Sequence, residues 1–234
     1  MNKRPVKVLL VLAGAFPILG LFQRPPQFML LIVTAFIVAL FFHRKIRSRF
    51  SKCRPLVAFW LCTVFSGYLA ETLAWGGHYA AGSKDPALLH PQLIADLILA
   101  TGFYTGWAAA WIIVSRFSRF TLRGVFWTAG ILGVFFEQMG AIFAAMVAGL
   151  LTNPVVSVGM AVFVWAVYGS IMGLGYLPFS QRLSSNSPSK WYAYPVAFIL
   201  MFLLASLLTT IVALAFAAVG LMPEKKPISQ FPLW

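Results

Sequence analysis

The sequence predicts an all-α integral membrane protein: a bundle of about seven transmembrane helices, with the N-terminus cytoplasmic and the C-terminus outside. Of the residues, 61% are hydrophobic and only 10% are charged, whereas roughly a quarter of the residues in a soluble domain are charged. The Lys and Arg residues also fall between long apolar runs. At about 20 residues per membrane span, the 234 residues form a single polytopic membrane domain with no room for a separate soluble one.

Seven apolar runs predict the helices. They cover about residues 8–22, 28–42, 56–75, 93–115, 125–151, 155–179 and 196–221. The first run follows a basic lead as in a signal peptide, but no small-x-small cleavage site follows it, so we expect a retained helix. The second run is short for a span and needs its flanks, or a locally thinner bilayer, to cross.

The basic residues predict the orientation. The segments on the N-terminal side of the predicted membrane contain 14 of the 18 Lys and Arg residues, and those on the other side contain four. Cytoplasmic loops carry an excess of Lys and Arg, which places the N-terminus inside and, with seven spans, the C-terminus outside. Topology thus accounts for the net charge of +13, and nucleic-acid binding is not expected.

The most basic loop, residues 43–55, predicts a contact with lipid. Lys and Arg residues beside a membrane attract anionic head groups. We therefore expect head-group contacts from six residues, with topology alone as the alternative reason for their charge: Arg44, Lys45, Arg47, Arg49, Lys52 and Arg54.

Three of the five acidic residues, Glu71, Asp96 and Glu137, lie inside apolar runs. A carboxylate in a bilayer is costly and marks a functional site that faces the protein interior. The rise per residue puts Glu137 about 18 Å and Glu71 about 22 Å from the cytoplasmic edge. Asp96 lies within about 5 Å of the outer edge. We therefore expect one outward-opening acidic cavity.

Three further polar residues belong to this predicted cavity. Gln138 follows Glu137 directly, and His78 and His90 occupy the predicted outer loop above the acids. The candidate binding or proton-site residues are therefore Glu137, Glu71, Asp96, Gln138, His90 and His78.

The face of the predicted helix around Glu137 consists of small residues at offsets of three, four and seven positions: Gly130, Gly133, Gly140, Ala141 and Ala144. Small residues allow a neighbouring helix to approach closely, and they offer no cation. We therefore expect Glu137 to be a neutral acid, hydrogen-bonded to a polar side chain of another helix such as Tyr104, Thr105 or Ser170.

Each acidic residue also has a structural alternative. In that case the protonated Glu137 side chain forms a structural hydrogen bond that bridges two helices. Glu71 reaches the interface or pairs with Lys84, and Asp96 complements the dipole of its helix. The two histidines are then ordinary loop residues.

Sequence motifs of several enzyme classes are absent. The chain has no HExxH zinc motif, no G-x-S-x-G nucleophile elbow, no P-loop and no dinucleotide fingerprint. Cys53 and Cys62 form neither a disulfide framework nor a metal site. The sequence therefore predicts no metal site, and it identifies no cofactor.

Three classes of function remain. The leading expectation is a pathway for a small solute, linked to protons or cations through Glu137. The second class is a non-catalytic subunit or assembly partner of a larger membrane complex. The third is an intramembrane enzyme that acts on a lipid or isoprenoid substrate, so enzymatic activity is left open.

Overall fold

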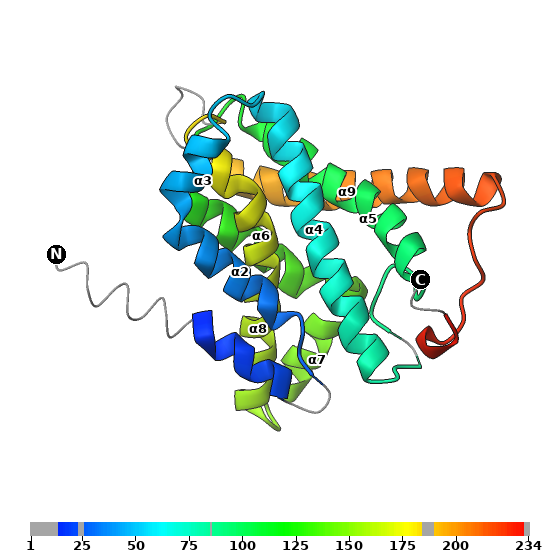
Figure 1. Ribbon diagram of the computed structural model, residues 1–234. Coiled ribbons are helices and arrows are strands. Elements are labelled where there is room, and N and C mark those ends of the chain that lie inside the picture. Colours follow the sequence, from blue (N-terminus) through cyan, green and yellow to red (C-terminus); the bar gives the residue numbers. More distant parts are fainter. Residues whose placement is uncertain (1–13, 23–25, 85, 184–189, 232–234) are drawn as a thin grey trace.

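The computed structural model describes residues 14–22, 26–84, 86–183 and 190–231, which form helices and contain no β-strand (Figure 1). The α-helices are α2 (Leu30–Phe41), α3 (His43–Arg49), α4 (Pro55–Ala80), α5 (Leu93–Val114), α6 (Leu122–Phe136), α7 (Ala141–Gly149), α8 (Pro154–Tyr176) and α9 (Ala193–Ala218). The 3-10 helices are η1 (Phe16–Phe22), η2 (Glu137–Gly140), η3 (Leu177–Phe179) and η4 (Ile228–Gln230).

Four helical segments of the described chain are long and apolar enough to cross a membrane: α4, α5, α8 with η3, and α9. The pair α6 and α7 forms a fifth candidate if the two helices make one span, because together they pass the same test. Helix α2 is apolar but shorter, with 12 residues. The described residues thus indicate a multi-pass membrane protein with four, or up to five, spanning segments.

Local sequence features mark the N-terminal ends of several of these helices. Pro55 and Pro154 occupy the first turns of α4 and α8, where proline costs no hydrogen bond because those N–H groups have no partner within the helix. The side chain of Thr121 accepts a hydrogen bond from the Gly124 N–H at 3.0 Å, and that of Asn153 accepts one from the Val156 N–H at 3.3 Å. These caps satisfy N–H groups in the first turns of α6 and α8.

Glycines allow two helix pairs to pack closely. Helix α5 packs mainly against α9, and α6 packs mainly against α8. A Cβ atom on Gly102 would lie 2.7 Å from the Leu208 oxygen of α9, and one on Gly106 would collide with the backbone at Ala205. On α6, Gly130 lies against the backbone oxygen and the ring of Trp165 of α8, and Gly133 lies against the side chain of Tyr168. Small residues at these crossings bring the helix backbones together.

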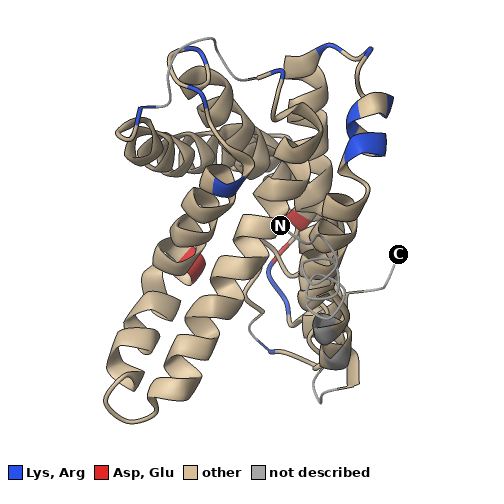
Figure 2. Ribbon diagram, turned by 90° about the vertical axis from the view of Figure 1, so that its left-hand side faces the viewer, with Lys and Arg blue, Asp and Glu red and all other residues tan. Residues whose placement is uncertain are grey.

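The basic loops meet at one end of the bundle, where the blue segments gather in Figure 2. Arg47 of α3 donates hydrogen bonds to the Leu177 oxygen at 3.3 Å and to Ser180 Oγ at 2.6 Å. Arg182 donates to the backbone oxygens of Phe50 and Cys53 at 2.9 and 3.0 Å. Three loops that are distant in the sequence are therefore joined at this end, because the Lys190 N–H also donates to Ser118 Oγ at 3.0 Å.

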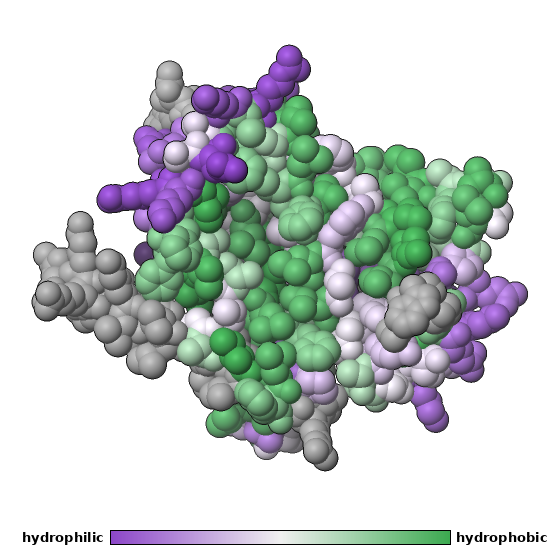
Figure 3. Space-filling view, viewed as in Figure 1, coloured by the Kyte–Doolittle hydropathy of each residue, from purple (hydrophilic) through white to green (hydrophobic). Residues whose placement is uncertain are grey.

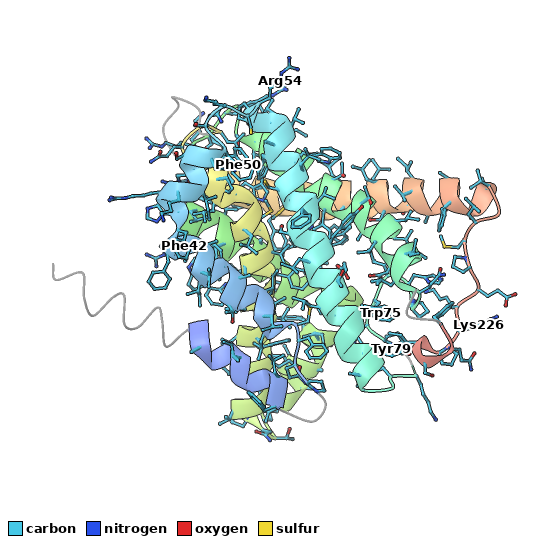
Figure 4. All side chains as sticks on the ribbon, in the orientation of Figure 1. Phe42, Phe50, Arg54, Trp75, Tyr79 and Lys226 are labelled. Atoms are coloured by element: carbon cyan, nitrogen blue, oxygen red, sulfur yellow. The ribbon has the colours of Figure 1, made fainter. Side chains whose placement is uncertain are left out.

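Apolar surface separates this basic end from the opposite end of the molecule (Figure 3). Figure 4 shows Phe50 and Arg54 at the basic end, and Trp75, Tyr79 and Lys226 toward the other. Trp75 donates from Nε1 to the Pro91 oxygen at 2.9 Å, and its ring stacks on Tyr79 with centroids 4.9 Å apart. Aromatic side chains with a polar atom are enriched at the edges of membranes.

Several predicted boundaries are corrected by the structure. Much of the predicted helix 8–22 lies outside the described residues, and its described end is partly the 3-10 helix η1. The predicted basic loop 43–55 contains α3. Helix α4 runs to Ala80 rather than residue 75, because the glycines and the histidine after Trp75 do not interrupt its backbone hydrogen bonds.

The prediction of one continuous helix over 125–151 is wrong. Helix α6 ends at Phe136, η2 follows, and α7 continues at an angle of 83° to α6. Gln138 has φ of 49° and Gly140 has φ of 88°. These left-handed conformations are incompatible with an α-helix, and glycine adopts them at little cost. The break places Glu137 at the junction of two helices, and the predicted shared face of Gly133 and Ala144 does not exist.

Candidate functional site

A cavity of about 410 Å³ lies among α4, α5, α6, α8 and α9, beside the loop between α4 and α5. Its volume falls within the range of roughly 300–1,000 Å³ that is typical of small-molecule sites. Aromatic and polar residues dominate the lining, and it contains no Lys, Arg or His. The polar lining residues are Glu71, Glu137, Gln138, Tyr168, Ser206, Thr209 and Thr210.

Glu137 enters this cavity through the break between α6 and α7. It is half-buried, and the Tyr168 phenol of α8 donates a hydrogen bond to its Oε2 atom. Gly133, one turn earlier on α6, leaves the space that the Tyr168 ring occupies. The expected hydrogen bond to another helix therefore exists, but its donor is Tyr168 rather than Tyr104, Thr105 or Ser170.

Glu71 reaches the same cavity from α4. The Tyr104 phenol of α5 donates a hydrogen bond to Glu71 Oε1 at 2.7 Å, and Gly67 leaves the space for the Tyr104 ring. Among the described residues Glu71 forms no ion pair with Lys84. Its carboxyl lies within electrostatic range of the Glu137 carboxyl. Two acids from different helices thus share one cavity, and a tyrosine donates to each.

Asp96 lies outside this cavity. It is buried in the first turn of α5, where its Oδ1 atom accepts a hydrogen bond from the His90 N–H at 2.9 Å. This bond fixes the loop that precedes α5. The geometry therefore fits the structural alternative for Asp96, and the three acids do not line one common cavity.

The two histidines also lie outside the cavity lining. His78 is in the last turn of α4, with Nδ1 3.1 Å from Ser83 Oγ. His90 is buried, and its Nδ1 accepts from the Gln92 N–H at 3.0 Å. That contact assigns the proton to Nε2, which donates to the Pro223 oxygen at 3.1 Å. Burial, more than the nearby Lys225, lowers the pKa of His90 below its usual value.

The aromatic lining of the cavity and the contribution of α9 to it were not predicted from the sequence. Phe103 and Trp107 of α5, Phe136 of α6 and Phe202 of α9 line the cavity together with Tyr168. The only local signal was the occurrence of Tyr104 and Tyr168 inside apolar runs, where a phenol needs a hydrogen-bond partner. The phenols lie 33 and 31 positions from the carboxyls to which they donate, so no helical spacing links them.

A second, larger hollow of about 660 Å³ lies between α2, α4 and α8 and reaches α3. Its lining is almost entirely apolar, contains no acidic residue, and includes Ile46 and Phe50 below the basic end. Of the predicted head-group residues on α3, Arg44, Lys45 and Arg49 are exposed and Arg47 is half-buried. The described residues contain no group of three or more His, Cys, Asp and Glu side chains that would hold a metal ion.

Comparison with known proteins found no similarity that assigns this chain to a family: no protein-family model, no curated protein and no solved structure matches it.

Proposed function

We propose that the chain binds a small solute in the cavity of Glu71 and Glu137 and moves it across the membrane in a step linked to protons or cations. The observation that carries this proposal is the meeting of two carboxyls from different helices in one cavity of about 410 Å³. Ionisable side chains within membrane segments are rare because they are costly, and they commonly mark ion pathways and proton relays.

The broken helix supports the same proposal. Non-helical backbone at membrane depth is tolerated where it is buried in protein or lines a cavity, and discontinuous helices often form the substrate sites of transporters. Here the break between α6 and α7 supplies Glu137 and Gln138 to the lining. The two acids and the non-helical backbone of the lining therefore support the proposal of a transport site.

We further propose seven crossings, with the N-terminus cytoplasmic and the C-terminus outside. The joined basic loops at one end of the described bundle support this orientation. The lining residues Ala87, Leu88 and Leu89 belong to the loop at the opposite end. In the proposed orientation the cavity opens outward.

Cys53 provides the test of the orientation, because it is exposed in the basic loop between α3 and α4. We expect a membrane-impermeant maleimide to label Cys53 only after the cells are opened, with Cys62→Ala as the background. A Ser83→Cys variant in that background, with Cys53→Ala added, is the matched control and labels from outside. Labelling of Cys53 in intact cells would overturn the orientation.

Proteoliposomes test the function itself. We expect the purified protein to accelerate the dissipation of an imposed proton or sodium gradient, relative to protein-free liposomes. Glu71→Gln and Glu137→Gln should each abolish this acceleration, because an amide cannot exchange a proton. Glu224→Gln, in the exposed tail, is the matched control and keeps it. Gradients that decay no faster than in protein-free liposomes, both without and with a panel of small solutes added, would contradict the proposal.

A role as an assembly partner is the second candidate, and α9 favours it. Only 17% of the apolar stretch of α9 is buried within this chain, against 39–56% of the corresponding stretches in the other three spanning segments. In Figure 1 its C-terminal half extends beyond the neighbouring helices. Co-purification of one stable membrane complex, together with full function of Glu137→Gln, would support this role over transport.

A further inference from the structure

Aromatic rings form much of the wall around Glu71 and Glu137. The Trp107 ring contacts Phe103 with centroids 5.1 Å apart and Tyr168 with centroids 5.7 Å apart. Phe136 of α6 and Phe202 of α9 also line the cavity, and their rings stack with centroids 4.1 Å apart. The faces of such rings carry negative charge density and attract a cation that lies within about 6 Å of the centroid.

The ionisable side chains that line the cavity are all acids. Its lining contains two carboxyls and no cationic side chain. The other titratable groups within electrostatic range of Glu71 are Asp96 and the Tyr104 and Tyr168 phenols, none of which is a cation at neutral pH. A cation that enters such a site favours the ionised form of these acids, so that its binding displaces a proton and leaves a carboxylate opposite the cation.

Two buried polar atoms of the lining residues have no hydrogen-bond partner among the described residues. Trp107 is fully buried, and its Nε1–H has no hydrogen-bond partner among the described residues. The same holds for the buried Oγ1 atom of Thr209. Buried polar atoms without a partner are rare in folded proteins, and each is costly. Neither atom is open to the cavity in this structure, so a ligand reaches them only if the neighbouring side chains move.

We propose that the cavity binds a small organic cation, an amine whose ammonium group lies between the carboxyls and the aromatic rings. This inference rests on the proposed function and names its substrate class. The two lining carboxyls supply only part of the six or more oxygens that a compact divalent ion takes, and waters or the other polar side chains of the lining would have to supply the rest. An organic body instead fills a volume of about 410 Å³ and contacts the apolar wall.

Binding to the purified full-length protein tests the charge requirement. Titration calorimetry in detergent compares benzylammonium, benzyltrimethylammonium and the neutral benzyl alcohol, which share a benzyl group and differ in their head groups. We expect both cations to bind at least about tenfold more tightly than the alcohol, because only they gain from the carboxyls and the ring faces. Equal affinity for the alcohol would overturn the proposal.

Substitutions locate the site. Glu71→Gln and Glu137→Gln should each weaken binding of benzyltrimethylammonium by about tenfold or more, and Phe202→Leu by a few fold. Glu224→Gln in the tail is the control and leaves binding unchanged. Cation binding that none of the three site variants weakens would place the ligand elsewhere and overturn the proposal.

The results also separate this inference from the proposed function. Protein that dissipates the ion gradient but binds neither cation leaves the transport proposal standing and excludes organic cations. Binding of the cations, with no effect on the gradient even when benzylammonium is added to the liposomes, keeps the ligand class and excludes linked transport. Failure of both measurements overturns both proposals.

Discussion

The phenol of Tyr168 on α8 donates a hydrogen bond to the carboxyl of Glu137, at the point where α6 ends. Tyr104 on α5 donates to Glu71 on α4 in the same manner. The ring of Trp107 contacts both tyrosine rings, with each centroid 5.7 Å away. The indole ring of Trp107 therefore lies between the two acid–tyrosine pairs and contacts the tyrosine of each.

Removal of the Tyr168 hydroxyl tests the first pair. Tyr168→Phe leaves the Glu137 carboxyl without its donor, and we expect a loss of stability of about 1 kcal/mol, the usual net value of such a hydrogen bond. If Glu137 is the neutral acid that the sequence predicts, its carbonyl stretch in the infrared spectrum should also rise in frequency, because a hydrogen bond to the oxygen weakens that bond.

The matched control for that prediction is Tyr104→Phe, which should change the Glu71 band and leave the Glu137 band in place. Glu137→Gln assigns the Glu137 band by removing it. A carboxylate band that disappears in Glu137→Gln at mildly acidic pH would show that Glu137 is ionised, contrary to the sequence prediction.

The crossing of α5 and α9 predicts a large effect from one added methyl group. A Cβ atom at Gly106 meets the α9 backbone at Ala205, and backbone cannot move aside as a flexible side chain can. We expect Gly106→Ala to destabilise the protein by about 1–3 kcal/mol, as overpacked cores do. Thermal unfolding in detergent measures this loss.

Gly159→Ala on α8 is the control, because a Cβ atom there has nothing within 4 Å. It should be neutral or slightly stabilising, since alanine favours a helix over glycine by about 0.5–1 kcal/mol. Equal melting temperatures for the two variants would contradict the close crossing.

The contact of His90 with Pro223 in the C-terminal tail predicts that the stability of the protein depends on pH. Burial lowers the pKa of His90 below its ordinary value of 6.5. Its contribution to stability is therefore fully present above pH 6.5 and is lost as the pH falls through the lowered pKa. Protonation of Nδ1 also removes the acceptor of the Gln92 N–H.

We expect the melting temperature of the wild type to fall more steeply below neutral pH than that of His90→Gln. Glutamine can still donate to the Pro223 oxygen, but it does not titrate. Parallel curves for wild type and His90→Gln would argue against this role of His90.

The exposed cations of α3 predict selective retention of anionic lipid. Replacement of Arg44, Lys45 and Arg49 by Gln should weaken binding of phosphatidylglycerol, at about 1 kcal/mol per charge, and should leave phosphatidylcholine unaffected. Arg47 is kept because it holds η3 and Ser180. Native mass spectrometry of the purified protein counts the bound lipids.

A triple replacement of Lys84, Lys225 and Lys226 at the opposite end removes the same charge and serves as the control. If both triple variants lose anionic lipid equally, the effect is one of net charge rather than of the basic end. An equal loss of both lipids would exclude an electrostatic contact.

Properties that depend on nearby residues could be predicted from the sequence. The positions of α2, α5, α8 and α9 and the alternation of basic loops follow from local hydropathy and charge. The break at Glu137 could not be predicted in this way. Gly140 permits a left-handed conformation, but Gly130 and Gly133 lie in a regular helix, so glycine alone did not distinguish a break from close packing.

The sequence by itself determined that Glu71, Asp96 and Glu137 lie in apolar segments, since this needs only the order of residues. Only the tertiary structure decided that Glu71 and Glu137 share a cavity while Asp96 holds the His90 loop. It also decided that Tyr104 and Tyr168 are the donors. The physical reason is that these contacts depend on how each helix is rotated and which helix it packs against. Bulky side chains and glycines from distant parts of the chain set that rotation jointly.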